Sequence, residues 1–335
     1  MKKLLPLMAV ALVPVGQTSS VQAQASARQV AGQTQPSPLA PGEIVAAAAR
    51  SDWIAIAPSD LLVMDLAPDA KGAARRVVIQ LMPPPFSQGW TGNIRKLAAE
   101  HWWDGLSINR VQDNYVVQWG DGNAEDAAKA KPLPAGLQAM DERDYVVSAR
   151  ECRETAKGCK GAPLPLAAPQ PGVARDPYAA QTGFFKGWPI AGDDRYDWPV
   201  HCYGMVGVGR DLSPNTGSGA ELYVVIGHAP RHLDRNIALV GRVIEGIEHL
   251  SSLPRGTAGL GFYELAEQRT GIKEIRLGNH VKGLPDYEYL STESASFARY
   301  ADARANRRDA FFIRPAGGAD ICNVPVPVRR APGAF

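Results

Sequence analysis

Four cysteines are the first residues in this sequence whose type and spacing could carry chemistry, namely Cys152, Cys159, Cys202 and Cys322. A metal site is disfavoured, because six residues separate the first pair and no nearby histidine completes a familiar ligand spacing. An even count in an oxidising compartment usually means disulfides, and three pairings are possible. We expect Cys152 to pair with Cys159, which would close a short surface loop, and Cys202 to tie the domain to its tail through Cys322.

Serine, glycine and histidine patterns point away from several enzyme classes. Gly217-Ser218-Gly219 lacks the strand-turn-helix context of a hydrolase serine, and Gly207-Val208-Gly209 lacks the full glycine-rich turn of a dinucleotide site. Among the six histidines only His228 and His232 have a short ligand-like spacing, and they fall in a proline-bearing loop. We therefore predict no catalytic triad, no metal ion and no cofactor.

The N-terminus resembles an export signal. Lys2 and Lys3 precede an apolar run from Leu4 to Val15, which is followed by polar residues and Ala23-Gln24-Ala25. This pattern predicts a cleaved signal peptide over residues 1–25 and a periplasmic protein. No later stretch approaches about 18 uncharged apolar residues, so we expect no stable membrane span. The formal net charge of +2 produces no large field, which argues against nucleic acid as a partner.

The rest of the chain divides by composition. Residues 26–46 are rich in Ala, Gln, Pro and Ser without periodicity, which predicts a flexible linker. Residues 47–278 carry the patterned segments of a single domain with one main core, interrupted by an Ala-, Pro-, Gly- and Asp-rich insertion at about 121–199. Residues 279–335 form a C-terminal extension, which we expect to pack on the domain.

Short β-rich runs recur along the domain, and two segments have apolar residues at helical spacing. The expected helices lie at 93–102 and 244–253. The expected strands lie at 60–66, 76–81, 107–111, 115–119, 205–208, 221–226, 238–243 and 272–277. Many short strands with only two helices predict a mainly β protein built on a closed antiparallel barrel, not on a parallel α/β sheet.

Two blocks of sequence, in this order, resemble the cyclophilins. The block from Val77 to Asp121 has a strand, a proline-marked turn, a helix, Trp-Asp-Gly, Arg-Val and Gln-Trp-Gly-Asp. The block from Gly204 to Gly246 has Pro-Asn-Thr and ends in Val-Gly-Arg-Val-Ile-Glu-Gly. The resemblance implies a closed eight-stranded antiparallel β-barrel capped by two α-helices, with a packed interior and peptide binding on its outer face. It also implies acceleration of rotation about X-Pro bonds, which takes roughly tens to hundreds of seconds without a catalyst.

The resemblance further implies which residues form the site. Rotation about an amide needs no nucleophile, only a fixed donor beside an apolar pocket. Arg110 matches the family's catalytic arginine, whose guanidinium has permanently charged, forked donors, and Gln118 matches the glutamine that orients it. The expected substrate-binding residues are Tyr115, Val116, Asp211, Glu221, Tyr223, His232 and Leu233.

Several positions depart from the family's pattern. Ile108-Asn109 stands where Phe-His is usual, Glu221 where a second glutamine is common, His232 where an aromatic residue is common, and Ile237 where a histidine is frequent. We expect Glu221 to form an ion pair with Arg110 and to compete with the substrate for its donors. The first hypothesis is therefore a peptidyl-prolyl isomerase, and the second is a catalytically weak module that binds peptides or proteins. The expected partners are proline-containing segments of unfolded or exported proteins, and the expected state is a monomer.

Overall fold

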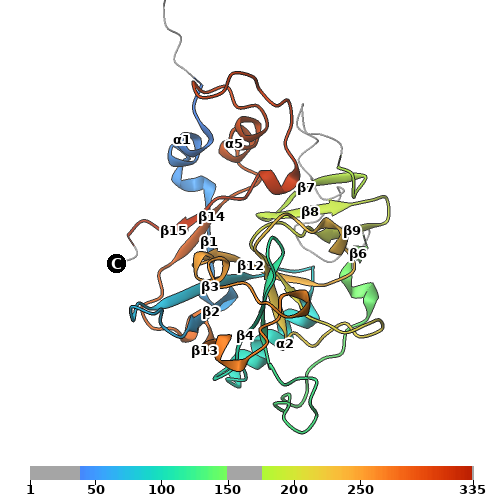
Figure 1. Cartoon of the computed structure of the whole chain (residues 1–335). Coiled ribbons are helices and arrows are strands. Elements are labelled where there is room, and N and C mark those ends of the chain that lie inside the picture. The colour runs from blue at the N-terminus through green and yellow to red at the C-terminus, as the bar shows by residue number, and fades with distance from the viewer. Residues whose placement is uncertain (1–37, 149–175, 334–335) are drawn as a thin grey trace, which may run out of the picture. The chain divides into compact units, whose positions relative to one another are not determined.

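The computed structural model describes residues 38–148 and 176–333 (Figure 1). Eight strands of this part of the chain close into an antiparallel barrel in the order β10-β11-β5-β4-β13-β2-β3-β12. Their bounds are β2 Leu61–Leu66, β3 Arg75–Leu81, β4 Ser107–Val111, β5 Val116–Gly120, β10 Met205–Val208, β11 Leu222–Val225, β12 Leu239–Glu245 and β13 Thr270–Leu277. The prediction of a mainly β fold with a closed antiparallel barrel is confirmed.

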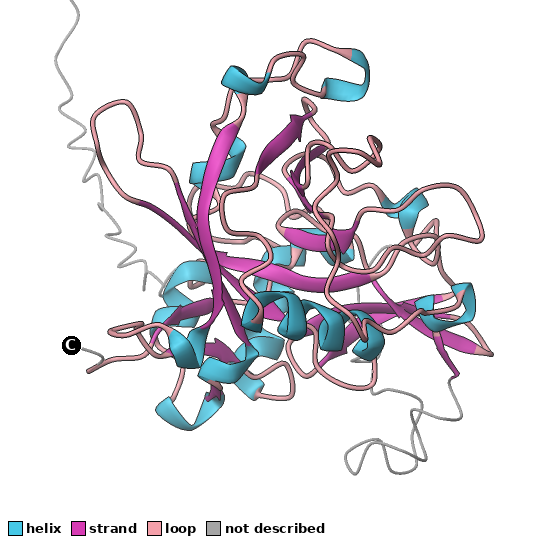
Figure 2. Ribbon diagram, turned by 90° about the horizontal axis from the view of Figure 1, so that it is seen from below, coloured by secondary structure: helices cyan, strands magenta, loops and turns pink. Residues whose placement is uncertain are grey.

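The barrel interior is filled by alternate side chains of its strands, as the period of two along a strand requires. Along β2, for example, Leu62, Met64 and Leu66 all belong to one buried cluster. Helix α2, Gln88–Ala99, adds Trp90 and Leu97 to the same cluster. Figure 2 shows this helix lying across the strands of the barrel. The interior is therefore a packed core, and the outer face is the surface that can meet a ligand.

Helix α2 ends three residues before the predicted end at residue 102, and a local motif explains the difference. His101 has a left-handed φ of 58°, which stops the helix. The backbone N–H of Trp102 then donates to the carbonyl of Leu97 at 3.0 Å, and that of His101 donates to Ala98 at 3.3 Å. These two bonds form a Schellman motif that closes the C-terminus, while Trp102 itself remains buried.

The predicted helix at 244–253 is largely wrong. Ile244 and Glu245 continue β12, where Glu245 pairs with Val78 of β3. Gly246 then turns the chain with a φ of 84°, in a position where a Cβ atom would lie 2.0 Å from the carbonyl oxygen of Arg76. Only the short helix α4, Glu248–Ser251, remains of the prediction. Sheet pairing here outweighs the helical spacing of the apolar residues.

A second apolar core lies beside the barrel, so the expectation of one main core is also wrong. The insertion contributes the sheet β6-β9-β8-β7, and the N- and C-terminal segments contribute the sheet β1-β14-β15. Phe184, Trp188 and Phe297 are among the residues buried between these elements. The strands are β1 Trp53–Ile56, β6 Val147–Ser148, β7 Gln181–Phe185, β8 Trp188–Gly192, β9 Tyr196–Pro199, β14 Tyr287–Leu290 and β15 Val328–Arg330.

Two helices complete this second region and change the predicted N-terminal boundary. Helix α1, Pro41–Ala46, packs against helix α5, Ala295–Ala305, and the two lie side by side in Figure 1. Ile44 of α1 is buried in the second core. Residues 41–46 are therefore part of the folded structure and not of the predicted flexible linker.

A disulfide joins the barrel to the C-terminal extension. Cys202, just before β10, is bonded to Cys322. This pairing is the one expected for these two cysteines, whereas Cys152 and Cys159 lie outside the described residues. In the described part of the chain, no helix has the length and apolar content needed to cross a bilayer.

Candidate active site

A row of four residues crosses the outer face of the barrel. Arg110 on β4 is opposite Gln118 on β5, Gln118 is opposite Tyr223 on β11, and Tyr223 is opposite Gly207 on β10. Opposite residues on neighbouring strands point to the same face of a sheet. The row therefore brings the two predicted catalytic residues, which lie on consecutive strands, next to a predicted pocket residue from a strand about 100 residues later in the sequence.

A β-bulge directs Arg110 outward. The register of β4 against β5 shifts between Ile108 and Arg110, so that Asn109 is an extra residue in β4. Ile108 is fully buried in the barrel core, and Nδ2 of Asn109 donates to the carbonyl of Gly120 on β5 at 3.0 Å. Ile108 and Asn109, which stand where the family usually has Phe-His, thus form the bulge that directs the Arg110 side chain to the outer face.

The Arg110 guanidinium is held in one orientation by three acceptors. Nε donates to the carbonyl of Leu260 at 2.7 Å, Nη1 donates to Oε1 of Gln118 at 3.2 Å, and Nη2 donates to Oε1 of Gln112. Burial lowers the pKa of Arg110, but an arginine remains protonated in proteins. Each Nη nitrogen carries two N–H groups, so one donor on each nitrogen is not used by these bonds.

Aromatic rings flank the guanidinium. Its central carbon lies 5.7 Å from the ring centroid of Tyr115 and 5.4 Å from that of Phe262, within the range of cation–π contacts. His232 stacks on Tyr115, with centroids 6.4 Å apart and ring planes 11° apart. Sequence reasoning missed Leu260 and Phe262, because they come from a loop about 150 residues after Arg110, at the short 3-10 helix η5, Gly259–Gly261, and show no periodic pattern.

An apolar floor lies next to the arginine. Val116, Tyr223 and Val225 form a buried cluster on the outer face, and Tyr115 and Ile237 pack against it. The Tyr223 ring lies over Gly207, where a Cβ atom would be 2.3 Å from the tyrosine hydroxyl oxygen. A glycine at this position therefore makes room for the ring. The predicted residues Tyr115, Val116 and Tyr223 are brought together here.

Glu221 does not form the expected ion pair with Arg110, so this prediction is wrong. Its Oε1 accepts instead from the backbone N–H of Asp121 at 2.7 Å, and its carboxylate also bonds with the side chain of Gln118. Since Oε1 of Gln118 accepts from Arg110, its amide nitrogen is the donor toward Glu221. Burial raises the pKa of Glu221 to about 7. The acid therefore acts on the arginine through the glutamine between them.

Two predicted residues belong neither to the row nor to the apolar floor. Asp211 is exposed in the loop after β10, where its carboxylate accepts from the backbone N–H of Leu212 at 2.7 Å. Leu233 is half-buried at the end of the 3-10 helix η4, Arg231–Leu233, which also carries His232. Their roles in binding stay predictions.

A buried histidine behind the floor was also missed. Nε2 of His201 lies 2.9 Å from the hydroxyl oxygen of Tyr223, and the histidine side chain is completely buried. Nothing in its spacing from the other histidines marks it. Within residues 38–148 and 176–333, no group of three or more His, Cys, Asp or Glu side chains is placed to hold a metal ion.

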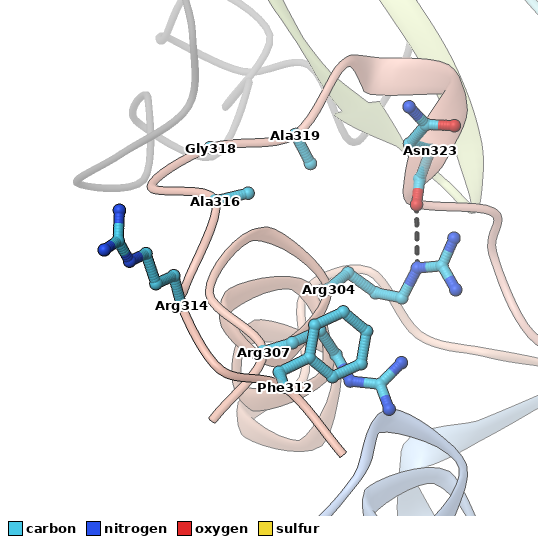
Figure 3. A pocket seen from close by; sticks show the side chains of 8 residues that line it. All are labelled: Arg304, Arg307, Phe312, Arg314, Ala316, Gly318, Ala319 and Asn323. Carbon is cyan, nitrogen blue, oxygen red and sulfur yellow. Dashed lines mark hydrogen bonds between the residues drawn. The ribbon is translucent and has the colours of Figure 1, made fainter. Parts of the chain in front are cut away.

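A separate hollow lies beyond the end of α5 and contributes nothing to this row. Its volume is about 360 Å³. The lining residues, shown in Figure 3, are Arg304, Arg307, Phe312, Arg314, Ala316, Gly318, Ala319 and Asn323. Nε of Arg304 donates to the carbonyl of Asn323 at 2.7 Å, and Arg307 is paired with Asp309. Two of its three arginine side chains thus already have partners within the chain.

The closed eight-stranded barrel, with Arg110 and Gln118 on its outer face, defines a protein of the cyclophilin class. A family model, the cyclophilin type peptidyl-prolyl cis-trans isomerase/CLD, matches residues 77–264, which is more than half of the chain. The chain belongs to this family. A search of curated proteins finds no match.

A solved cyclophilin structure shares the fold. The chain is similar to the cyclophilin AquaCyp293 from Hirschia baltica, with a TM-score of 0.57 and 21% identity over 83% of this chain and 94% of that one. A cyclophilin type peptidyl-prolyl cis-trans isomerase from Cryptosporidium parvum matches with a TM-score of 0.37 and 12% identity, over 65% of this chain and 97% of that one.

Proposed function

We propose that this protein accelerates the cis–trans interconversion of X-Pro bonds in exported proteins during their folding. The observation that carries the proposal is the fixed Arg110 guanidinium beside the apolar floor of Val116 and Tyr223. Family membership gives the reaction class, and this geometry supports Arg110 and the apolar floor as the residues that would perform it.

The chemistry requires stabilisation of a twisted amide. The X-Pro bond has partial double-bond character and a rotation barrier of about 18–20 kcal/mol. When the amide twists, its nitrogen regains a lone pair and becomes an acceptor, so a donor that is already oriented stabilises the twisted form more than the planar one. The N–H groups of Arg110 left over from its bonds to Gln118 and Gln112 supply this donor. The proline ring would lie on the floor beside them.

Two features support action on exported chains. Residues 1–25 have the pattern of a cleaved signal peptide. The disulfide between Cys202 and Cys322 also suits an oxidising compartment such as the periplasm. Cell fractionation tests the localisation by comparing the full chain with a chain that lacks residues 1–25. We expect only the full chain in the periplasmic fraction, and equal retention of both chains in the cytosol would overturn it.

The central experiment compares the mature protein with two arginine variants in an NMR exchange assay on X-Pro peptides. We expect Arg110→Ala to lower kcat/KM by about a hundredfold while the protein stays folded, because the oriented donor is lost. Arg76→Ala is the matched control, since Arg76 forms a surface ion pair with Asp65 on the β2–β3 hairpin. A folded wild-type protein without rate enhancement on any peptide would favour the peptide-binding module instead.

A further inference from the structure

Tyr223 has a buried hydroxyl group at the floor of the candidate proline pocket. The residue is 5% exposed, and burial raises the pKa of its phenol well above the ordinary value. The hydroxyl is therefore a neutral hydrogen-bond donor that is shielded from solvent. A buried donor without a partner is destabilising, so the position of the ring depends on what accepts from this group.

His201 is that acceptor, and Asp234 determines its tautomer. Nδ1 of His201 lies 2.9 Å from Oδ1 of Asp234, which also accepts from the backbone N–H of His201 at 3.0 Å. A carboxylate can only accept, so Nδ1 carries the proton and Nε2 keeps a lone pair. The Tyr223 hydroxyl, 2.9 Å away, donates to that lone pair. Burial lowers the pKa of His201, which keeps the ring neutral.

The carboxylate of Asp234 is held in place by a buried arginine. Nε of Arg231 donates to Oδ2 of Asp234 at 2.6 Å, and the guanidinium of Arg231 also binds both oxygens of Asp176 at 2.7 and 3.2 Å. The side chains of Arg231, Asp234 and Asp176 are all at most 4% exposed. A chain of buried polar groups, each with a partner, is rigid, because any displacement leaves a buried group unpaired.

We infer that His201 and Asp234 are positioning residues that hold the Tyr223 ring as a rigid floor and keep its hydroxyl away from the substrate, so that the pocket accepts an apolar five-membered ring. This inference rests on the proposed function. The ring plane of His201 lies 10° from that of Tyr223, as expected for an acceptor in the plane of the phenol. With its hydroxyl bonded to His201, Tyr223 offers the proline ring only carbon atoms, as a phenylalanine would.

The test is a double-mutant comparison measured as kcat/KM on an X-Pro peptide. We expect His201→Phe to lower kcat/KM about tenfold, because the Tyr223 hydroxyl is left without its acceptor. Tyr223→Phe removes the need for that acceptor, so the double variant should recover to within about threefold of wild type. Tyr300→Phe is the matched control, since its buried hydroxyl donates to Pro325 in the second core at 2.7 Å. Losses that multiply in the double variant would overturn the inference.

Two further measurements distinguish positioning from plain stabilisation. His201→Gln, which supplies both an amide donor and a carbonyl acceptor, should restore more activity than His201→Phe at equal Tm. The preference for proline over pipecolate, its six-membered analogue, should narrow in His201→Phe but not in Tyr300→Phe. Equal losses on both substrates would mean that His201 only stabilises the fold, and would overturn the inference.

A readout independent of activity separates this inference from the proposed function. Imidazole ¹⁵N spectra of the wild-type protein should show His201 neutral and protonated at Nδ1 between pH 6 and 8, in accordance with its bond to Asp234. A proton at Nε2, or a cationic ring, would overturn the inference even if the enzyme is active. An inactive wild-type protein with the expected tautomer would instead count against the proposed function and, with it, the proline pocket.

Discussion

Gln118 connects Arg110 to Glu221. Its Oε1 accepts from Nη1 of the arginine at 3.2 Å, and its amide nitrogen faces the carboxylate of Glu221. An amide that is free to flip would present its donor to the guanidinium half of the time, which would repel it. The acid thus selects the amide orientation that supports the arginine.

Gln118→Ala should lower kcat/KM by about tenfold or more, because a hydrogen bond to a charged group contributes roughly 1.5–3 kcal/mol. The arginine would keep its bonds to Leu260 and Gln112. The exchange assay measures the change, with Gln181→Ala, at an exposed position of β7, as the control. Equal activity of the two variants would show that the arginine needs no support from β5.

Glu221 should make the stability of the protein depend on pH. Its pKa is raised from 4.5 to about 7, chiefly by burial, so between these values the folded state binds more protons than the unfolded state. The free energy of unfolding should therefore fall as pH rises from about 4.5 to 7, and the full penalty, on the order of 3 kcal/mol, should be present above pH 7.

Glu221→Gln removes this penalty while keeping a hydrogen-bonding side chain at the same position. We expect the variant to be more stable than wild type at pH 8 and about equally stable at pH 4.5, as measured by urea denaturation. The difference between the two proteins at each pH isolates Glu221 from the other titrating groups. A constant difference across this range would mean that the folded-state pKa of Glu221 is close to its ordinary value.

Phe262 should assist Arg110 through its ring. The guanidinium carbon lies 5.4 Å from the ring centroid, and the phenylalanine is 38% exposed. Phe262→Ala should lower kcat/KM by about two- to fivefold, because a cation–π contact of this kind contributes roughly 0.5–1 kcal/mol. Phe311→Ala, at a position 82% exposed, serves as the control. An equal loss of kcat/KM in both variants would show that Phe262 has no specific role at the arginine.

The strands of the barrel could be predicted from sequence because their pattern is local. β2 and β3 are short runs rich in β-branched and other apolar residues, and Pro68 to Gly72 mark the turn between them. The bulge at Asn109 has no such pattern, because it depends on how β4 pairs with β5. The second core could not be predicted for a related reason, because it joins the insertion to segments that are distant in the sequence.

The candidate site was predictable only where a motif named its residues. Arg110 and Gln118 lie within one block that resembles the cyclophilins. His201 and Asp234 are 33 residues apart and meet only because their strands and loops fold together. The ion pair of Glu221 with Arg110 was a reasonable expectation from charge alone. It fails because Gln118 lies between them and the backbone N–H of Asp121 binds the carboxylate.

The disulfide between Cys202 and Cys322 should be a major source of stability. It links residues 120 positions apart, and constraining a loop of that size in the unfolded chain contributes roughly 4–5 kcal/mol in the chain-entropy account. Cys202→Ala with Cys322→Ala should therefore lower the free energy of unfolding by about 2–5 kcal/mol in urea denaturation. The control is Cys152→Ala with Cys159→Ala, because a bridge between these residues would close a loop of only about eight residues and contribute roughly half as much. Peptide mapping without reductant establishes both pairings beforehand, and a larger loss in the control pair would refute the loop-size argument.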